Sequence, residues 1–361
     1  MPPQTPSAPV TEKYSMLLED DKCIVGASSM QGWRPTMEDA HTVYLTLPRL
    51  KNHHEDDGAI FAVFDGHCGT KCAQLCAANI VHWLCQSDSY LQGDYARGLF
   101  DAFIHGDASL RASLGRDTSG CAAIVTLIVG KMLYCASAGD SRAMICRNGE
   151  AVVLTEDHKP TLSVEKKRIE LSGGFVMNGR VNGVLALSRA FGDFPLKDEA
   201  LAPQHQAVTV VPSVATVELS KYDEFLVVGC DGIFEKKNNE EVVYFVRNAI
   251  RRQRELGHTA DMSKVCEELM VDCLGPAHNL KGSDNMSAIV VLFKDALAGN
   301  SVMEEAALGP LLSSSPPKHQ HEHVFAASAA TSIATTTGGT GSATSSLASR
   351  PPVENSSQLE I

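Results

Sequence analysis

The chain has 361 residues, of which 44% are hydrophobic and 20% charged, and its formal net charge is −12 at pH 7. This composition indicates a globular protein with one sizeable core, and the negative charge argues against a nucleic-acid partner, because an acidic surface repels a polyanion. No apolar run reaches the roughly 20 residues that a membrane-spanning helix requires, and the first fifteen residues lack the apolar stretch of a signal peptide. We therefore expect a soluble monomer in the cytoplasm, with a nuclear location also open, and no transmembrane segment.

Composition divides the chain into three parts. Residues 1–20 are predicted to form an N-terminal extension and residues 21–298 a single folded domain, in which apolar runs alternate with turn residues. Residues 299–361 are rich in Ser, Thr and Ala and contain few large apolar side chains, so burial cannot offset the entropy that ordering would remove. We expect this last part to be a disordered tail.

Apolar runs and helical spacing predict the elements of the folded domain. In chain order, strands are expected over residues 42–47, 59–64, 122–129, 132–138, 143–147, 225–228 and 287–293, and helices over residues 70–85 and 240–255. The two-residue connection Gly130-Lys131 indicates antiparallel pairing of the strands that it joins. We expect an α+β fold, a four-layer α-β-β-α sandwich in which helices cover the outer faces of two mainly antiparallel sheets.

The eleven cysteines are expected to be reduced and buried. Their number is odd, and most of them lie inside apolar segments. Cys68, Cys72 and Cys76 recur every four residues, which is the spacing of one helix face, whereas zinc sites usually contain cysteine pairs separated by two residues. We therefore favour a helix face over a zinc site.

Acidic residues stand where predicted strands begin or end. Strands run into Asp65, Asp140 and Asp231, whereas Glu38-Asp39 and Asp284-Asn285 precede strands. Because the beginning of one antiparallel strand lies beside the end of its neighbour, these positions can share one edge of the sheets. Carboxylates gathered there would repel one another unless cations neutralise them, and all-oxygen ligation suits Mg²⁺ or Mn²⁺. Each Asp-Gly pair taken singly also fits an ordinary hairpin turn, so the hypothesis depends on the convergence.

Two further residues fit the hydrolysis of a phosphate ester at such a centre. Two cations about 3.5 to 4 Å apart can acidify a bound water and aim it at phosphorus. Arg34 could hold a phosphate dianion with two hydrogen bonds, and His67 could protonate the departing oxygen as a general acid. The plainer alternatives are a surface ion pair for Arg34 and a partly buried histidine bonded to the backbone for His67.

Eight short motifs carry a resemblance to a known family. They are RPTMEDAH at 34–41, VFDGHCG at 63–69, GDSRA at 139–143, DHKP at 157–160, RVNG at 180–183, LSRAFGDF at 187–194, CDG at 230–232 and SDNMS at 283–287. In this order they resemble the motifs of the PP2C, or PPM, family of metal-dependent protein phosphatases. The resemblance implies a protein serine/threonine phosphatase that acts on phosphoprotein substrates.

The resemblance also implies a centre of two Mn²⁺ or Mg²⁺ ions with a weaker third. Carried over motif by motif, it implies that Asp65 bridges both ions and that Gly66 contributes its carbonyl oxygen to one of them. Glu38, Asp231 and Asp284 would serve the other ion, and Asp140 the third.

Other positions take supporting roles in this resemblance. Asp39 and Asn285 would orient ligands and waters, and catalysis would fall to Arg34, Asp65 and His67, with Arg34 also binding the phosphate. Residues 164–182 resemble the flap beside the family's active site, and they fit an ordinary amphipathic helix equally well. Cys121 and Phe234-Glu235 stand where the family commonly has a small hydroxyl residue and Trp-Asp.

Two other classes of protein were weighed against a metal-dependent phosphatase. A cysteine phosphatase is excluded because none of the eleven cysteines is followed six residues later by the arginine that such an enzyme needs. A pseudophosphatase, which would keep the fold as a regulatory binding module, is expected to have lost ligands. Glu38, Asp65, Asp231 and Asp284 are all present.

Overall fold

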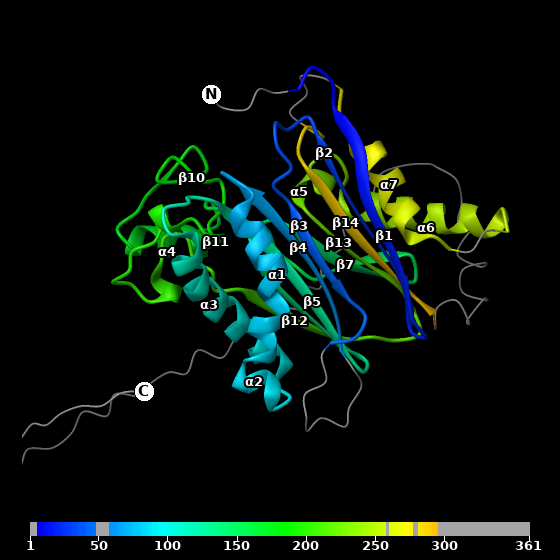
Figure 1. Ribbon diagram of the computed structural model, residues 1–361, viewed down its shortest axis with the longest axis horizontal. Coiled ribbons are helices and arrows are strands. Elements are labelled where there is room, and N and C mark those ends of the chain that lie inside the picture. Colours follow the sequence, from blue (N-terminus) through cyan, green and yellow to red (C-terminus); the bar gives the residue numbers. More distant parts are fainter. Residues whose placement is uncertain (1–5, 48–57, 258–259, 277–280, 295–361) are drawn as a thin grey trace, which may run out of the picture. The chain divides into compact units, whose positions relative to one another are not determined.

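The strands pair into two antiparallel sheets (Figure 1). The computed structural model describes residues 6–47, 58–257, 260–276 and 281–294. The first sheet has the order β1 (Val10–Glu19), β2 (Cys23–Gly32), β14 (Met286–Phe293), β13 (Asp223–Gly229), β7 (Arg142–Arg147) and β8 (Glu150–Val153). The second has the order β12 (Ser213–Glu218), β6 (Met132–Ala138), β5 (Gly120–Val129), β4 (Ala59–His67) and β3 (Ala40–Tyr44), and β11 (Phe191–Gly192) also pairs with β5.

The central strands are apolar along their whole length because both of their faces are buried. Along β4, Ile60, Ala62 and Phe64 pack with the helices outside the second sheet, whereas Phe61 and Val63 pack between the two sheets. Successive side chains of a strand point to opposite faces. One core therefore lies between the sheets, and a further core lies on the outer face of each sheet.

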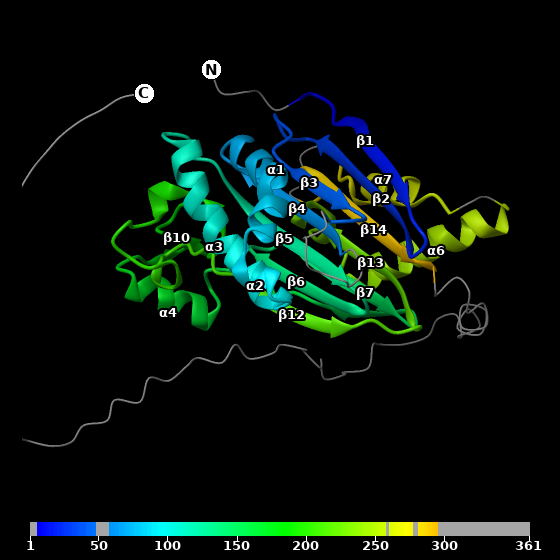
Figure 2. The ribbon, with the colours of Figure 1, turned by 60° about the horizontal axis from the view of Figure 1, so that its bottom comes forward.

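Helices cover these outer faces, as Figures 1 and 2 show. α1 (Lys71–Cys85), α2 (Asp88–Leu91) and α3 (Tyr95–Leu114) pack on the second sheet, and α5 (Asp231–Phe234), α6 (Asn239–Glu255) and α7 (Met262–Cys273) pack on the first. The segment between β8 and β12 contains α4 (Ser163–Leu171), the short hairpin of β9 (Val176–Met177) and β10 (Arg180–Val181), and the 3₁₀ turns Phe194–Leu196 and Pro203–His205. α6 begins at a capping box formed by Asn238 and Glu241.

The predicted fold class is confirmed, and every predicted strand and helix is present with its ends shifted by a few residues. One shift matters for function: β4 continues through Asp65 to His67, so Asp65 lies within a strand and not just after it. The longer elements that the prediction missed are β1, β2, β12, α3 and α7. β2 escaped because Gly26, Ser28 and Ser29 interrupt its apolar pattern, although all three are buried.

The structure describes most of the predicted N-terminal extension and none of the predicted tail. β1 lies inside the predicted N-terminal extension of residues 1–20 and pairs with β2 along its length, so the sheet begins before the predicted boundary at residue 21. The predicted tail at residues 299–361 lies outside the described residues. Among the helices that the structure does describe, none combines the length and apolar character needed to cross a bilayer.

The contact between β2 and α7 gives a test of this packing. A Cβ atom on Gly26 would lie 2.0 Å from the carbonyl carbon of Met262, so Gly26→Ala must push the backbone of α7 away. We expect the free energy of unfolding in urea to fall by about 3 kcal/mol. Gly93→Ala is the control: φ is +84° and no atom lies within 4 Å, so only backbone strain of about 1 kcal/mol applies. Equal losses in both variants would contradict the close packing of β2 on α7.

Candidate active site

Four segments bring carboxylates together at one edge of the two sheets. Asp65 lies near the end of β4, Asp140 follows β6, Asp231 begins α5 and Asp284 precedes β14. Oxygen atoms of Asp65, Asp140 and Asp231 lie within 4.8 Å of one another, and so do oxygen atoms of Asp231, Glu235 and Asp284. Because Asp231 belongs to both groups, these side chains form one continuous carboxylate cluster.

Glycines next to two of the aspartates let the segments approach closely. A Cβ atom on Gly66 would lie 2.1 Å from the carbonyl oxygen of Glu38, and one on Gly232 would lie 2.1 Å from the carbonyl oxygen of Asn285. No side chain fits at either place. The Asp-Gly pairs are therefore sites of contact between segments, and the hairpin-turn alternative does not describe them: β4 leads into α1, and Asp231 begins α5.

Burial and mutual repulsion raise the pKa values in the carboxylate cluster. Burial, followed by repulsion from Asp231, raises the pKa of Asp65 well above its usual range. Burial, followed by repulsion from Asp140 and Asp284, does the same to the pKa of Asp231. Like charges held this close in a poorly solvated site disfavour the ionised form. A cation bound among these side chains would favour it again.

The donor set fits hard divalent cations. Burial raises the pKa of Asp39 to about 7, and its Oδ1 atom is buried without a hydrogen-bond partner in the part of the chain that the structure describes. Its Oδ2 atom accepts a hydrogen bond from Ser287 Oγ at 2.8 Å. The neighbouring donors are almost all carboxylate oxygens, which Mg²⁺ and Mn²⁺ prefer. The residues present are therefore suited to holding such ions.

Asn285 ties the loop that carries Arg34 and Glu38 to the start of β14. Its Oδ1 atom accepts a hydrogen bond from the Glu38 amide at 2.9 Å. Its Nδ2 atom donates to the carbonyl oxygens of Gln31 at 2.8 Å and Thr36 at 3.0 Å. One side chain thus satisfies three main-chain groups and fixes Glu38 beside the cluster.

Arg34 and Glu38 lie at the rim of the cluster. The Arg34 guanidinium pairs with Asp284, and its side chain remains 54% exposed. Burial lowers the pKa of Arg34, but attraction to Asp284 outweighs burial, so the pKa is raised. The Glu38 carboxylate accepts hydrogen bonds from Thr36 Oγ1 at 2.8 Å and from the Gly69 amide at 3.2 Å, and it belongs to neither group of three carboxylates described above. Arg34 therefore faces both the carboxylates and solvent.

His67 pairs with a carboxylate that the sequence did not single out. Its Nε2 atom lies 2.9 Å from Oδ1 and 2.8 Å from Oδ2 of Asp193. Asp193 has a left-handed backbone, with φ of 51°, and its carboxylate occupies the space where a Cβ atom on Gly120 would lie, 2.2 Å from Oδ2. Burial lowers the pKa of His67, but the hydrogen bond and charge of Asp193 outweigh it, so the pKa is raised. The partner of Nε2 is therefore an acid and not the backbone.

Three residues of the site were missed by sequence reasoning. Glu235 follows Asp231 by four residues on a helical turn, and that spacing could have found it. Lys159, which pairs with Asp140, and Asp193 lie in the motifs at 157–160 and 187–194. No local pattern gives their partners, because both pairs form across distant segments.

The segment predicted as a flap is anchored through α4. The buried Glu165 accepts hydrogen bonds from Arg168 and Arg189, each at 2.6 Å, and from Ser188 Oγ at 2.7 Å. Burial works against ionisation, but these partners outweigh it and lower the pKa of Glu165 to about 2. Ile169 is also buried, while other positions of the helix are solvated. The segment is thus a helix with a buried charged anchor, and it lacks the apolar face of an amphipathic helix because two of its large apolar side chains are exposed; a hairpin follows it.

Comparison with known proteins decides the family. The family model described as Protein phosphatase 2C matches residues 24–279. The chain belongs to the PP2C family. Protein phosphatase 2C homolog 2 of Hypocrea jecorina is 46% identical over 298 residues, covering 80% of this chain and 67% of that protein. Probable protein phosphatase 2C 6 of Paramecium tetraurelia is 39% identical over 303 residues, covering 80% of this chain and 98% of that protein.

A solved structure supports the same assignment. A phosphatase from Toxoplasma gondii matches with a TM-score of 0.66 and 26% identity, covering 79% of this chain and 96% of that one. The chain is therefore a protein phosphatase of the PP2C family, as its motifs predicted. The part matched by the family model includes Asp65, Asp140 and Asp231, and Asp284 lies just beyond it.

Asn285 offers a test of how this PP2C phosphatase positions its loop. Asn285→Ala leaves three main-chain groups without their partner, so we expect the free energy of unfolding to fall by about 2 to 4 kcal/mol. Turnover should fall as well, because the loop with Arg34 and Glu38 loosens. Asn238→Ala, which removes the cap of α6, should cost about 1 kcal/mol and leave turnover unchanged. A stable and fully active Asn285→Ala variant would contradict the positioning role.

Proposed function

We propose that the protein hydrolyses phosphoserine and phosphothreonine in phosphoprotein substrates, using two Mn²⁺ or Mg²⁺ ions and a weaker third. The observation that carries this proposal is the overlap of the two carboxylate groups at Asp231, with Arg34 paired to Asp284 and His67 two residues beyond Asp65 on β4. Membership of the PP2C family supports it. The side chains that repel one another in isolation are those that cations would hold together.

Each predicted ligand has a defined place in this proposal. Asp65, the carbonyl oxygen of Gly66, Asp231 and Asp284 would hold the two ions, Glu38 would complete their surroundings, and Asp140 would serve the third, with Glu235 within reach of Asp231 and Asp284. When bound, such ions neutralise charge and supply a water of lowered pKa. Asp39 and Asn285 would keep these donors in position through their hydrogen bonds to Ser287 and to the Glu38 amide.

Arg34 would bind the phosphate of the substrate. Its guanidinium has donors beyond the one that pairs with Asp284, and its exposure leaves them accessible. Two of them can hold two phosphate oxygens at once. The negative charge of the phosphate is thereby placed next to the carboxylate cluster, where it would otherwise be repelled.

His67 would protonate the leaving group. The oxygen of the attacking water forms a new bond to phosphorus as the bond to the serine or threonine oxygen breaks, and that oxygen needs a proton. Asp193 engages Nε2, so Nδ1 is the ring nitrogen that would deliver it. Asp193 also favours the protonated form of the ring. We infer that Asp193 is a positioning residue for His67.

A regulatory module without turnover is the alternative function. A missing acidic residue would favour such a pseudophosphatase, whereas Asp65, Asp140, Asp231 and Asp284 are present and lie close together, which supports turnover. An assay separates the two functions. Turnover of a phosphothreonine peptide should require Mn²⁺ or Mg²⁺ and stop with chelator, whereas binding of the peptide without hydrolysis under every condition would favour the module.

Asp65→Asn tests whether the cluster exists to hold cations. Without metal, removal of one buried charge should relieve repulsion, so the variant should melt at or above the temperature of the wild type. With Mn²⁺ at about 100 times its dissociation constant, the wild type should gain about 2.7 kcal/mol and the variant much less, and the variant should lose turnover. Calorimetry with and without Mn²⁺ compares the thermal stability of the two proteins under both conditions. Equal stabilisation of both proteins by Mn²⁺ would show that Asp65 is not a ligand of the metal centre.

The pair of His67 and Asp193 predicts a dependence on the leaving group. His67→Gln should slow hydrolysis of a phosphothreonine peptide by roughly 10²-fold, and p-nitrophenyl phosphate much less, because its leaving group needs little protonation. Asp193→Asn should show the same difference between substrates with a smaller loss. Asp101→Asn, on α3 and away from the site, is the control and should slow neither substrate. Equal losses on both substrates would assign His67 and Asp193 a purely structural role.

A further inference from the structure

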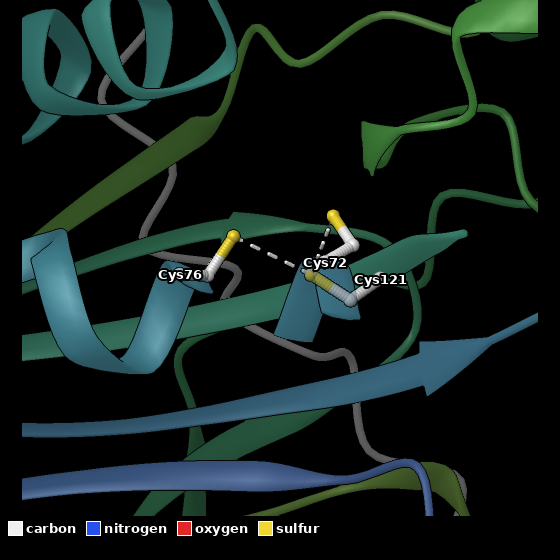
Figure 3. Close-up of side chains that lie close together, drawn as sticks. All are labelled: Cys72, Cys76 and Cys121. Carbon is white, nitrogen blue, oxygen red and sulfur yellow. Dashed lines mark hydrogen bonds between the residues drawn. The ribbon is translucent and has the colours of Figure 1, made fainter. Parts of the chain in front are cut away.

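Three cysteine sulfurs meet in the core between α1 and β5 (Figure 3). Cys72 and Cys76 lie one turn apart on α1, and Cys121 lies on β5. Cys121 Sγ is 3.8 Å from Cys72 Sγ and 3.7 Å from Cys76 Sγ, and all three sulfurs lie within 4.8 Å of one another. None of the three residues has exposed surface. The four-residue spacing in the sequence had grouped Cys68 with Cys72 and Cys76, but Cys68 is exposed and Cys121 takes its place.

The separations between these sulfurs are close to those around a bound metal ion. Three sulfurs arranged in a plane around an ion at about 2.3 Å lie about 4.0 Å from one another, a few tenths of an ångström more than the separations found here. Sulfurs of packed thiols in van der Waals contact lie at a similar separation, so the spacing alone does not distinguish a metal site from simple packing. It does mean that an ion could enter with little movement of α1 against β5.

The three thiols of the cluster differ in acidity: burial raises the pKa of Cys76 and of Cys121 well above the usual range. Hydrogen bonds from the thiols of Cys121 and Cys76 lower the pKa of Cys72 well below its usual range, against the effect of burial. Burial raises the pKa of Cys135 and of Cys266, as expected for thiols in an apolar core. The two neighbouring thiols can therefore stabilise Cys72 as a thiolate, the form that binds metals best, and the contact between the three sulfurs is what makes a shared ligand set.

We propose that Cys72, Cys76 and Cys121 bind one Cu⁺ ion. Soft sulfur ligands select Cu⁺ or Zn²⁺, and Zn²⁺ in structural sites almost always has four ligands. No fourth His, Cys, Asp or Glu joins this group within the described ranges of the chain. Cu⁺ is stable with three sulfur ligands, and one thiolate together with two neutral thiol donors balances its single charge, so no net charge is buried. No electron is transferred: the ion bonds to three sulfurs, and a proton that a thiol releases passes to solvent.

The proposed Cu⁺ site lies next to the segment that positions His67. Cys121 belongs to the part of β5 that pairs with β11. A Cβ atom on Gly192 would lie 2.8 Å from Cys72 Sγ, and the next residue, Asp193, holds His67. A bound ion would therefore join α1 to β5 beside this pair. Binding of Cu⁺ does not depend on phosphatase activity, so failure of either proposal leaves the other standing.

An anaerobic titration of the full chain tests the site. Reduced, metal-free protein carrying Cys68→Ser, which removes the exposed thiol, is titrated with Cu⁺ in competition with bathocuproine disulfonate. We expect one equivalent to be retained, and X-ray absorption at the copper edge should show three sulfur neighbours and no nitrogen or oxygen. Release of all Cu⁺ to the chelator, or a shell containing nitrogen or oxygen, would overturn the proposal.

Matched variants locate the ion. Cys76→Ala and Cys121→Ala each remove a ligand and should weaken Cu⁺ retention by more than roughly 100-fold. Cys135→Ala, which removes an equally buried cysteine from β6, should retain Cu⁺ like the parent. Equal retention in all three variants would place the ion elsewhere and overturn the assignment. Circular dichroism checks that each variant folds. If a variant does not fold, X-ray absorption on the parent protein still tests the proposed sulfur ligands.

Discussion

Repulsion between buried carboxylates is the constraint around which this protein is arranged. Asp65, Asp140 and Asp231 approach within 4.8 Å of one another in a site where burial already disfavours their ionised forms. Packing elsewhere must hold them there, because the side chains alone would separate. Two features do this: β14 pairs with β13 so that Asp284 and Asp231 meet, and Gly66 lets the end of β4 reach the Glu38 backbone.

The same repulsion explains where the positive charges lie. Arg34 pairs with Asp284 and Lys159 pairs with Asp140, and both cationic side chains remain partly exposed, at 54% and 42%. The proposed function assigns neutralisation of the remaining carboxylates to bound cations, and it leaves Arg34 with donors that a phosphate could share. His67 stands apart, because Asp193 gives it an anionic partner of its own. In the proposed function, the binding of cations and the transfer of a proton therefore fall to separate groups of residues.

A feature of this protein could be predicted from the sequence when it depends on residues that are close together in the chain. The strands with apolar side chains on both faces, such as β4 and β14, were found because burial leaves a local pattern. The acidic residues were found because each follows or precedes such a strand. Asp193 was missed because its partner is 126 residues away and its left-handed backbone breaks any local pattern. Cys121 lies 49 residues from Cys72 in the chain, so the thiol cluster is visible only once α1 is packed against β5.

The most direct measurement is a crystal structure of the protein grown with Mn²⁺ and recorded at the manganese absorption edge. Anomalous scattering locates the ions without reference to the protein atoms. We expect two strong peaks that share the Asp65 carboxylate, with Asp231 and Asp284 around one of them. Manganese bound only at other surfaces, with Asp65 and Asp231 in contact with protein atoms alone, would contradict the view that this edge of the sheets is built to hold cations.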